Sequence, residues 1–458
     1  MRTKFDQAAT PVASAPQPAK IASGNQARDL LVCSHMRVYW LMVLALGACT
    51  TESFVDDPAD GAWLDGKQDG ASAVDVAATH LDIHLTNHTG VATIDLEKNG
   101  NVELEAGGLT ISAVHDDRGK RHYTKTTAGK LRVSNVRGPL VVDYAFTVHS
   151  NADGLLGGGS TVLWPYFCGN LFPCHSQPAD GTAFSLSLDG IPVGSTAIFP
   201  SEIVADAPPY MLAWAVGRYS TQVLGTTTAG TKVSVDWLPN GMTAALAGTA
   251  HLVQAFDWYE QHLGPYAFGH DVASVAVVWG EGMYGGMEHH PYWHVASDAM
   301  SNEETHVHEA AHGWFGDGIR LRCWEDFVLS EGTVSYLAAH VMGKVAGAAA
   351  ETKIWDGYRA ELESAVSEGG APAWPTGCNK IDILKDKLFT NLPYMEGAYF
   401  YKDVAAQVGA DALDEVLHDF YLAHRGQPAG MQDMLDLIRT KTGFDATQLA
   451  TERLRRQF

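Results

Sequence analysis

The chain has 458 residues, of which 46% are hydrophobic and 18% are charged, and its formal net charge is −22. This length exceeds that of one ordinary domain, so we expect two or three domains with sizeable cores. The acidic balance favours solubility and excludes nucleic acid as an expected partner.

The first 49 residues carry a targeting pattern. A short positive start at Met36 leads into an apolar run that closes on small residues before Cys49. This pattern is typical of a bacterial lipoprotein signal, and the run is too short to span a bilayer as a mature helix. We therefore expect residues 1–49 to be a leader, with Met36 as the candidate true start. Cys49 then becomes the lipid-anchored end of an exported protein, in the outer membrane because Thr50 rather than Asp follows it. The alternative is a cytosolic protein with a small apolar patch.

Composition and periodicity divide the rest of the chain into three segments. Residues 50–79 are rich in Asp, Gly and Ala, which predicts a flexible tether. Residues 80–240 hold short alternating runs between turn signals, which predicts an antiparallel β-sandwich domain. The runs lengthen in residues 241–458, beginning with one long amphipathic helix at 244–263, and most of this segment follows helical periodicity. The sequence therefore predicts an α+β multidomain protein whose last domain is mostly α-helical.

Four cysteines lie beyond the leader, and an even number permits two disulfides in an oxidising compartment. Cys168 and Cys174 are the natural local pair, which leaves Cys323 and Cys378 for the second. Free buried thiols are the alternative.

A His-Glu-x-x-His motif is the strongest chemical signal in the chain. On a helix His308 and His312 lie on one face, so one Zn²⁺ can accept both imidazoles. Glu309 is one residue out of line with them, which suits a general base acting on water better than a ligand. The alternative is a salt-bridged exposed helix, but the small or apolar neighbours Ala310 and Trp314 favour a buried one.

The flanks of the motif predict the helices that carry the site. Ser301 and Glu304 predict a capping box ahead of it, and Gly316 predicts a helix stop. Eighteen residues separate the motif from Glu331, which lies on a second predicted helix, 326–342, that can return antiparallel to the first. We therefore expect Glu331 to be the third ligand of one zinc ion per chain, with the fourth position left for water as catalytic zinc requires.

Several segments together resemble the gluzincin zinc aminopeptidases, the family of membrane alanyl aminopeptidase and leukotriene hydrolase. Residues 305–336 are similar to the family's zinc block. Residues 285–289, Gly-Gly-Met-Glu-His, resemble its Gly-x-Met-Glu-Asn exopeptidase motif, and residues 394–398 resemble the block that carries the catalytic tyrosine. The matches run in family order from about residue 80 to residue 458, so we expect a short two-domain bacterial member with a thermolysin-like catalytic domain.

The resemblance also implies a role for each matched residue. Zinc would be bound by His308, His312 and Glu331. Glu309 would be the general base and then the general acid to the leaving amine, and Tyr394 would donate its hydroxyl to the tetrahedral oxyanion. The substrate's N-terminal end would be bound by the exopeptidase segment, with Glu288 on the free α-ammonium: Gly285, Gly286, Met287, Glu288 and His289.

Three positions depart from the family pattern. His289 stands where the family has Asn, and Ser330 replaces the Asn before the ligand Glu331. A gapless count of ten residues back from Cys174 reaches Trp164, where the family has Glu or Gln as a second anchor for the substrate amine. An aromatic wall then replaces that anchor.

Other side chains near the site have two possible roles. Asp326 is either a partner of a ligand histidine or the N-cap of its helix. His290 and His294 form either an accessory metal cluster or exposed loop positions. The expected reaction is removal of N-terminal residues from peptides. An endopeptidase or other amide hydrolase without N-terminal register, and a catalytically silent zinc-binding scaffold, remain the alternatives.

Overall fold

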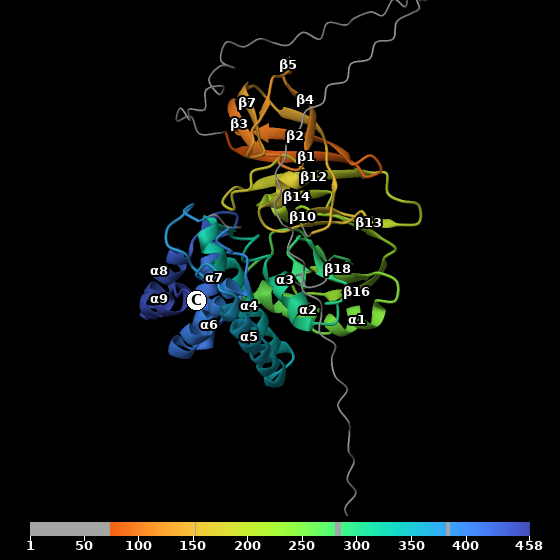
Figure 1. Cartoon of the computed structure of the whole chain (residues 1–458). Helices are drawn as coiled ribbons and strands as arrows, with labels where there is room; N and C mark the ends of the chain where they lie inside the picture. The colour runs from red at the N-terminus through yellow and green to blue at the C-terminus, as the bar shows by residue number, and fades with distance from the viewer. Residues whose placement is uncertain (1–73, 152, 280–284, 382–384) are drawn as a thin grey trace, which may run out of the picture. The chain divides into compact units, whose positions relative to one another are not determined.

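The structure is a computed structural model that describes residues 74–151, 153–279, 285–381 and 385–458 (Figure 1). The predicted leader, Cys49 and most of the predicted tether lie outside these residues. Among the described helices, none has the combination of length and apolar character that crossing a membrane requires.

A seven-stranded sheet organises the N-terminal, β-rich domain. Its order is β14-β12-β1-β2-β8-β4-β5. The strands are β1 (Val76–His84), β2 (Thr89–Leu96), β4 (Thr110–Asp116), β5 (Gly119–Lys120), β8 (Leu140–Ala145), β12 (Thr182–Asp189) and β14 (Glu202–Ala207). Alternate residues of β1, including Leu81 and Ile83, are buried, as the period of a strand with one core face requires.

Two expectations for this domain were wrong. Strand β1 begins at Val76, inside the segment predicted to be a tether, and its first residues pair with β2. The sheet is also mixed rather than antiparallel, because β1 runs parallel to β12 with Leu81 beside Leu186. Alternation of buried residues predicts a strand, but the direction of its neighbour depends on a partner about a hundred residues away.

Smaller sheets complete the β-rich domain. One contains β3 (Gly100–Glu105), β7 (Lys130–Val136) and β6 (Thr124–Lys125), and another contains β11 (Thr161–Leu163), β10 (Asp153–Leu156) and β9 (Val148–His149). Strands β13 (Thr196–Ile198) and β15 (Ala215–Gly217) pair with each other. The Cys168–Cys174 disulfide closes the loop after β11 and confirms the predicted local pair.

A second sheet belongs to the C-terminal domain. Its order is β16-β17-β18-β20-β19, with β16 (Ser220–Thr226), β17 (Lys232–Trp237), β18 (Asp271–Val277), β20 (Tyr292–Ala296) and β19 (Gly286–Met287). The predicted boundary at residue 240 was therefore too late. Strands β16 and β17 join the C-terminal domain because β17 pairs in parallel with β18.

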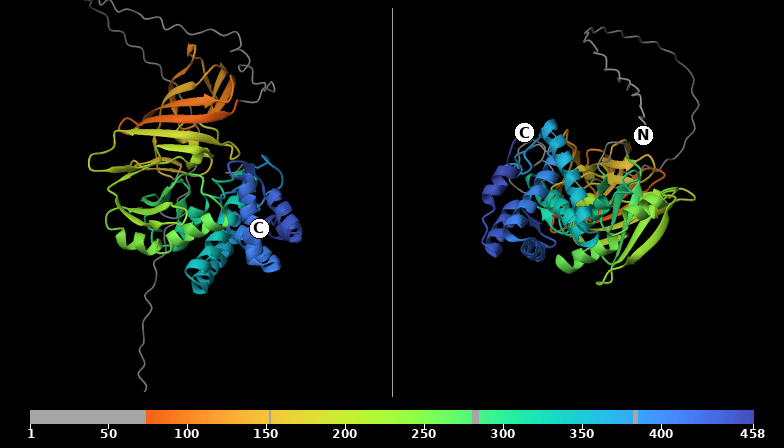
Figure 2. Two further views of the ribbon diagram at one scale, coloured as in Figure 1. Left: turned by 180° about the vertical axis from the view of Figure 1, so that it is seen from behind. Right: turned by 90° about the horizontal axis from the view of Figure 1, so that it is seen from below.

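The remainder of the C-terminal domain is helical (Figure 2). Its helices are α1 (Met242–Gly248), α2 (Leu252–His262), α3 (Glu303–Ala311), α4 (Phe327–Val345), α5 (Ala348–Glu368), α6 (Asn391–Val408), α7 (Ala410–His424), α8 (Met431–Thr442) and α9 (Thr447–Leu454). The one helix predicted at 244–263 is two, because the chain turns at Thr249, whose hydroxyl donates to the Ala245 carbonyl at 2.7 Å.

Helix α4 is the central helix of this domain. Every residue from Phe327 to Met342 is buried, and α3, α5 and α6 pack around it. The short strands β21 (Arg320–Leu321) and β22 (Pro428–Ala429) pair beside its N-terminus. The Cys323–Cys378 disulfide, the second predicted pair, joins this region to the segment before α6.

Candidate metal and catalytic centre

Helix α3 carries the motif with different ends from those predicted. Its N-cap is Asn302 rather than Ser301, and the predicted capping box does not form. The Glu304 carboxylate lies 2.7 Å from the Tyr358 hydroxyl instead. The helix ends at Ala311, before the predicted stop at Gly316, yet His312 keeps a helical backbone as its C-cap. The two histidines therefore still lie on one face.

The three predicted ligands converge on one point. The Nε2 atoms of His308 and His312 lie 3.3 Å apart, and Glu331 Oε2 lies 3.3 Å and 3.4 Å from them. Atoms at tetrahedral corners about 2.0–2.1 Å from a central ion lie about 3.3–3.4 Å from one another. Glu331 Oε2 is also buried without a hydrogen-bond partner among the described residues. The donor set and its spacing therefore fit zinc.

Neighbouring groups orient these ligands. His312 Nδ1 lies 3.0 Å from the Phe315 carbonyl, which can only accept, so Nδ1 donates and the Nε2 lone pair faces the centre. Ser330 Oγ lies 3.3 Å from the same Nδ1, so the departure at this position still contacts a ligand. Burial acts to raise the pKa of Glu331, but the facing imidazoles of His312 and His308 outweigh it and lower this pKa.

Asp326 is at the N-cap of α4, one of the two roles expected for it, but its side chain makes no capping hydrogen bond and binds elsewhere. Its Oδ1 instead accepts from Met431 N at 2.9 Å and from Trp374 Nε1 at 3.2 Å. Asp326 therefore secures the start of α8.

Glu309 and Glu288 face the same centre from two elements. Together with His312 they offer polar atoms that all lie within 4.8 Å of one another. Glu309 leaves α3 toward β19, where a Cβ on Gly286 would collide with its carboxylate. Glu288 follows β19 and is 3% exposed, and its Oε1 has no hydrogen-bond partner among the described residues. Burial raises the pKa of both carboxyl groups, and the imidazoles act against it.

The histidines after Glu288 were expected to bind substrate or metal, or to be exposed. His290 is fully buried: its Nε2 donates to the Glu309 carbonyl at 2.8 Å and its Nδ1 accepts from the Tyr266 hydroxyl at 2.7 Å. Burial lowers the pKa of His290 to about 3, so it is neutral. His294 is also buried, so neither residue is an exposed loop position. His290 therefore fixes the backbone of Glu309, a role that the sequence did not reveal.

His289 does not lie where the resemblance placed it. Its ring is 2% exposed and is not among the residues that line the pocket. Its Nε2 accepts from Leu163 N at 3.2 Å, directly before Trp164. Trp164 does line the pocket, as the gapless count predicted, and packs edge-on against Phe389 with ring centres 5.8 Å apart. Two of the three departures from the family pattern therefore meet here, because His289 contacts the residue before Trp164.

Tyr394 enters the centre from α6. Its ring stacks beside His308 with centroids 6.1 Å apart and packs edge-on against Phe327 at 5.8 Å. Helix α6 can approach α4 this closely because glycines face each other. A Cβ built on Gly332 would lie 2.6 Å from the Gly397 Cα. The two glycines thus set the distance between Tyr394 and the ligand Glu331.

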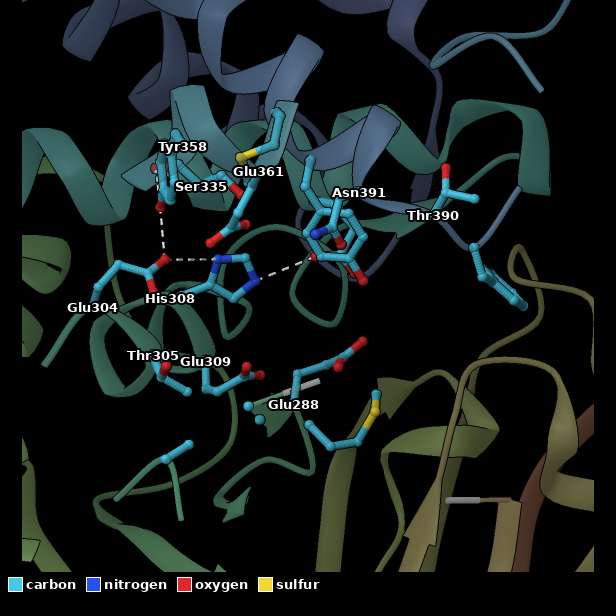
Figure 3. Close-up of a pocket in the computed structure, with 18 of the residues that line it drawn as sticks. Glu288, Glu304, Thr305, His308, Glu309, Ser335, Tyr358, Glu361, Thr390 and Asn391 are labelled. Carbon is cyan, nitrogen blue, oxygen red and sulfur yellow. Dashed lines mark hydrogen bonds and ion pairs between the residues drawn. The ribbon is translucent and has the colours of Figure 1, made fainter. Parts of the chain in front are cut away.

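A pocket of 640 Å³ opens on these groups. Gly285, Gly286, Met287 and Glu288 line it beside Glu309, His308, His312, Glu331 and Tyr394. Sequence reasoning missed several other lining residues: Glu304, Ser335, Tyr358, Glu361, Glu368, Phe389, Thr390 and Asn391. In Figure 3, Glu304 lies to the left of the His308 ring, Tyr358 and Glu361 lie above it, and Glu288 lies below and to its right. Of the missed residues, those on α5 could have been found from their shared helical face.

A family model described as the peptidase family M1 domain matches residues 253–453. This segment of the chain is similar to the peptidase family M1 domain. The matched range contains the three ligands, Glu309, Glu288 and Tyr394. The match lies in the mostly helical C-terminal domain and follows a β-rich domain, as the predicted resemblance and fold class expect apart from the mixed sheet.

Curated relatives resemble this chain over part of their length. Leucine aminopeptidase 2 of Emericella nidulans is 23% identical over 62% of this chain and 49% of its own length. Leucine aminopeptidase 2 of Chaetomium globosum is 22% identical over 81% of this chain and 60% of its own. The chain thus spans about half the length of the first of these curated relatives.

Solved structures share the fold. An M1 zinc metallopeptidase from Deinococcus radiodurans superposes with a TM-score of 0.70 and 19% identity, over 85% of this chain and 97% of that one. Yeast LTA4 hydrolase in complex with bestatin superposes with a TM-score of 0.70 and 18% identity, over 86% of this chain and 71% of that one.

Proposed function

We propose that this protein is a zinc aminopeptidase that removes N-terminal residues from peptides. The observation that carries the proposal is the convergence of three zinc-competent ligand atoms with two further buried carboxylates in one pocket. The relatives named leucine aminopeptidase support the same reaction class. A mutant of the Deinococcus radiodurans enzyme has been solved with a bound Tyr-Ser-Ala substrate, so this fold accommodates a short peptide.

The residues of this chain divide the work of peptide hydrolysis. His308, His312 and Glu331 would hold a zinc ion, which would supply Lewis acidity and lower the pKa of water. Glu309 accepts a proton from the attacking water and returns it to the leaving amine, and its burial and raised pKa suit a proton carrier. Tyr394 donates its hydroxyl to the oxyanion that develops on the scissile carbonyl.

Glu288 sets the N-terminal register. Its buried carboxylate with an unpartnered Oε1 can accept a free α-ammonium, which would otherwise lose its hydration without compensation. A substrate bound in this way places its first peptide bond at the centre. Trp164 contributes apolar surface on the pocket wall and offers no second carboxylate.

Cleavage of short peptides in free and N-acetylated forms tests the proposal. Zinc-loaded protein starting at Thr50 should cut free-amine peptides one residue from the end and leave acetylated ones intact. Cleavage of both forms would favour an endopeptidase. Zinc binding without cleavage of either form would favour a silent scaffold.

Replacing Glu288 separates its anchoring role from a structural one. Glu288→Ala should lower kcat/KM for free-amine peptides by about tenfold or more, because a charge-assisted contact contributes on the order of 1.5–3 kcal/mol. Steady-state kinetics on free-amine and N-terminally blocked substrates measure the difference. An equal loss on both kinds would assign Glu288 a structural role.

We also propose that the protein is exported and lipid-anchored through Cys49. The support is the sequence pattern that ends at this cysteine, which lies outside the described residues. Metabolic labelling with a palmitate analogue should mark the wild type in the envelope fraction, and Cys49→Ala should abolish the label. Unlabelled wild type in the cytosol would refute the anchor.

A further inference from the structure

The pocket is strongly acidic. Six glutamates line it, and none of the described lining residues is lysine or arginine. Three of the six have roles in the proposed reaction: Glu288, Glu309 and Glu331. Of the other three, Glu304 on α3 lies 3.9 Å from His308 Nδ1, whereas Glu361 and Glu368 on α5 have no role in the proposed reaction. A zinc ion at the three predicted ligands would compensate charge near them, but the α5 carboxylates project from a different helix.

These carboxylates form an ordered face. Tyr358, Glu361, Ser364 and Glu368 recur along α5 at spacings of three and four residues, so they share one side of the helix, and all four line the pocket. Tyr358 anchors this face to α3, because its hydroxyl lies 2.7 Å from Glu304 Oε1 and 3.1 Å from the Ser335 carbonyl. Burial and the nearby Glu304 carboxylate raise the pKa of Glu361. The Glu304 and Glu361 carboxylates therefore lie near each other, and none of the described lining residues is a lysine or arginine that could neutralise them.

The position of the predicted metal ligands indicates which part of a bound peptide would meet the α5 carboxylates. Buried Glu288, whose Oε1 is unpartnered, is aimed into the same pocket and receives the substrate's α-ammonium. The scissile carbonyl then lies at the three metal ligands. The chain beyond it must continue away from Glu288, and in the view of Figure 3 Tyr358 and Glu361 lie above the His308 ring whereas Glu288 lies below it.

We propose that Glu361, with Glu304 and Glu368, forms a subsite for a cationic side chain on the leaving part of the peptide, so that lysine or arginine is preferred after the first residue. This inference rests on the proposed aminopeptidase function. A lysine or arginine side chain has the reach and charge to meet carboxylates at a partly exposed rim, and such ion pairs contribute modestly but selectively.

The test uses peptides with a free N-terminal alanine and one varied second residue: lysine, its uncharged analogue norleucine, or glutamate. For the zinc-loaded wild type, kcat/KM should be about fivefold higher for lysine than for norleucine, and lower still for glutamate, and the differences should shrink as salt is raised. Moving lysine to the third position maps whether the subsite receives the second or the third residue.

Variants locate the preference on α5. Glu361→Gln should reduce the lysine-to-norleucine ratio, and Glu361→Lys should reverse the order of lysine and glutamate peptides. Glu363 provides the matched control, because it is exposed on the same helix and does not line the pocket. Glu363→Gln and Glu363→Lys should retain the wild-type ratio, and thermal melts verify that all variants are folded.

The outcomes separate the two proposals. Cleavage of all free-amine peptides at equal rates, or a preference that Glu361→Lys leaves unchanged, would overturn the subsite while leaving the aminopeptidase intact. Failure to cleave any free-amine peptide would overturn the proposed function and the subsite with it.

Discussion

At the scale of single residues, the centre depends on which atom of each side chain faces inward. The Phe315 carbonyl directs the Nε2 of His312 to the centre, and His290 holds the carbonyl of Glu309. The Glu309 carbonyl would ordinarily receive a helical N–H four residues on, but α3 has ended by then. His290 therefore replaces a backbone donor at the residue that we assign as the base.

Replacing the base should separate metal binding from turnover. Glu309→Gln keeps the shape of the side chain and leaves the three ligands in place, but it cannot accept a proton. We expect kcat to fall by about 10²–10⁴-fold while zinc content stays at one per chain. Metal analysis and steady-state kinetics on one preparation measure both, and wild-type turnover would remove Glu309 from the proposed mechanism.

The Tyr394 hydroxyl can be removed without removing its ring. Tyr394→Phe retains the packing against His308 and Phe327. Loss of one preorganised oxyanion donor lowers kcat by about 10²–10³-fold, so we expect a change of this size with little change in KM. A rise in KM at constant kcat would indicate instead that Tyr394 binds the ground-state substrate.

At the scale of helices, the close contact between α4 and α6 is the decisive feature. Glu331 is on one helix and Tyr394 on the other, and Gly332 and Gly397 face each other between them. Gly332 directly follows Glu331 on α4, and Gly397 lies three residues after Tyr394 on α6. The two helices can therefore bring Glu331 and Tyr394 to the same pocket only while both contact positions lack a Cβ.

Adding a single methyl group at this contact tests whether the two glycines set the distance between α4 and α6. Gly397→Ala places a Cβ against the Gly332 backbone, and such overpacking costs about 1–3 kcal/mol. We expect a lower melting temperature together with a lower kcat, because α6 must move away from α4.

Gly357 supplies the matched control for this change. It lies within α5, and a Cβ there would meet nothing within 4 Å. Gly357→Ala should therefore be neutral or stabilising by up to about 1 kcal/mol. If both variants melt alike and turn over alike, the glycine contact does not control the geometry of the site.

At the scale of the whole molecule, the three predicted ligands come from elements that are distant in sequence. Helix α3 supplies both histidines and α4 supplies Glu331, and α5 and α6 pack on α4. The β-rich domain contributes Trp164 to the pocket wall. It is joined to the C-terminal domain by Arg320, whose Nε donates to the Ala179 carbonyl at 3.0 Å.

Removing zinc should therefore affect stability as well as activity. A ligand that binds only the native state stabilises it by about 2.7 kcal/mol at a hundred times its Kd. We expect chelation to abolish turnover and lower the melting temperature, and added zinc to restore both. Scanning calorimetry with and without chelator measures the shift, and an unchanged melting temperature with full activity in chelator would contradict the metal assignment.

The sequence by itself determined the local chemistry of this protein. The spacing of His308 and His312 follows from the helical repeat, and the disulfide pairs and the fold class were predictable for similarly local or compositional reasons. Glu331 and Tyr394 were predictable because they resemble family motifs at matching places in the chain. Such patterns predict structure correctly because they depend mainly on residues that are close in sequence.

Only the tertiary structure decided the positions that depend on distant partners. The direction of β12 beside β1, the move of β16 and β17 into the second sheet, and the burial of His289 against Leu163 each require a contact between remote segments. Asp326 likewise holds α8 rather than its own helix. A side chain's burial and hydrogen-bond partner are properties of the packed molecule, so local periodicity cannot specify them.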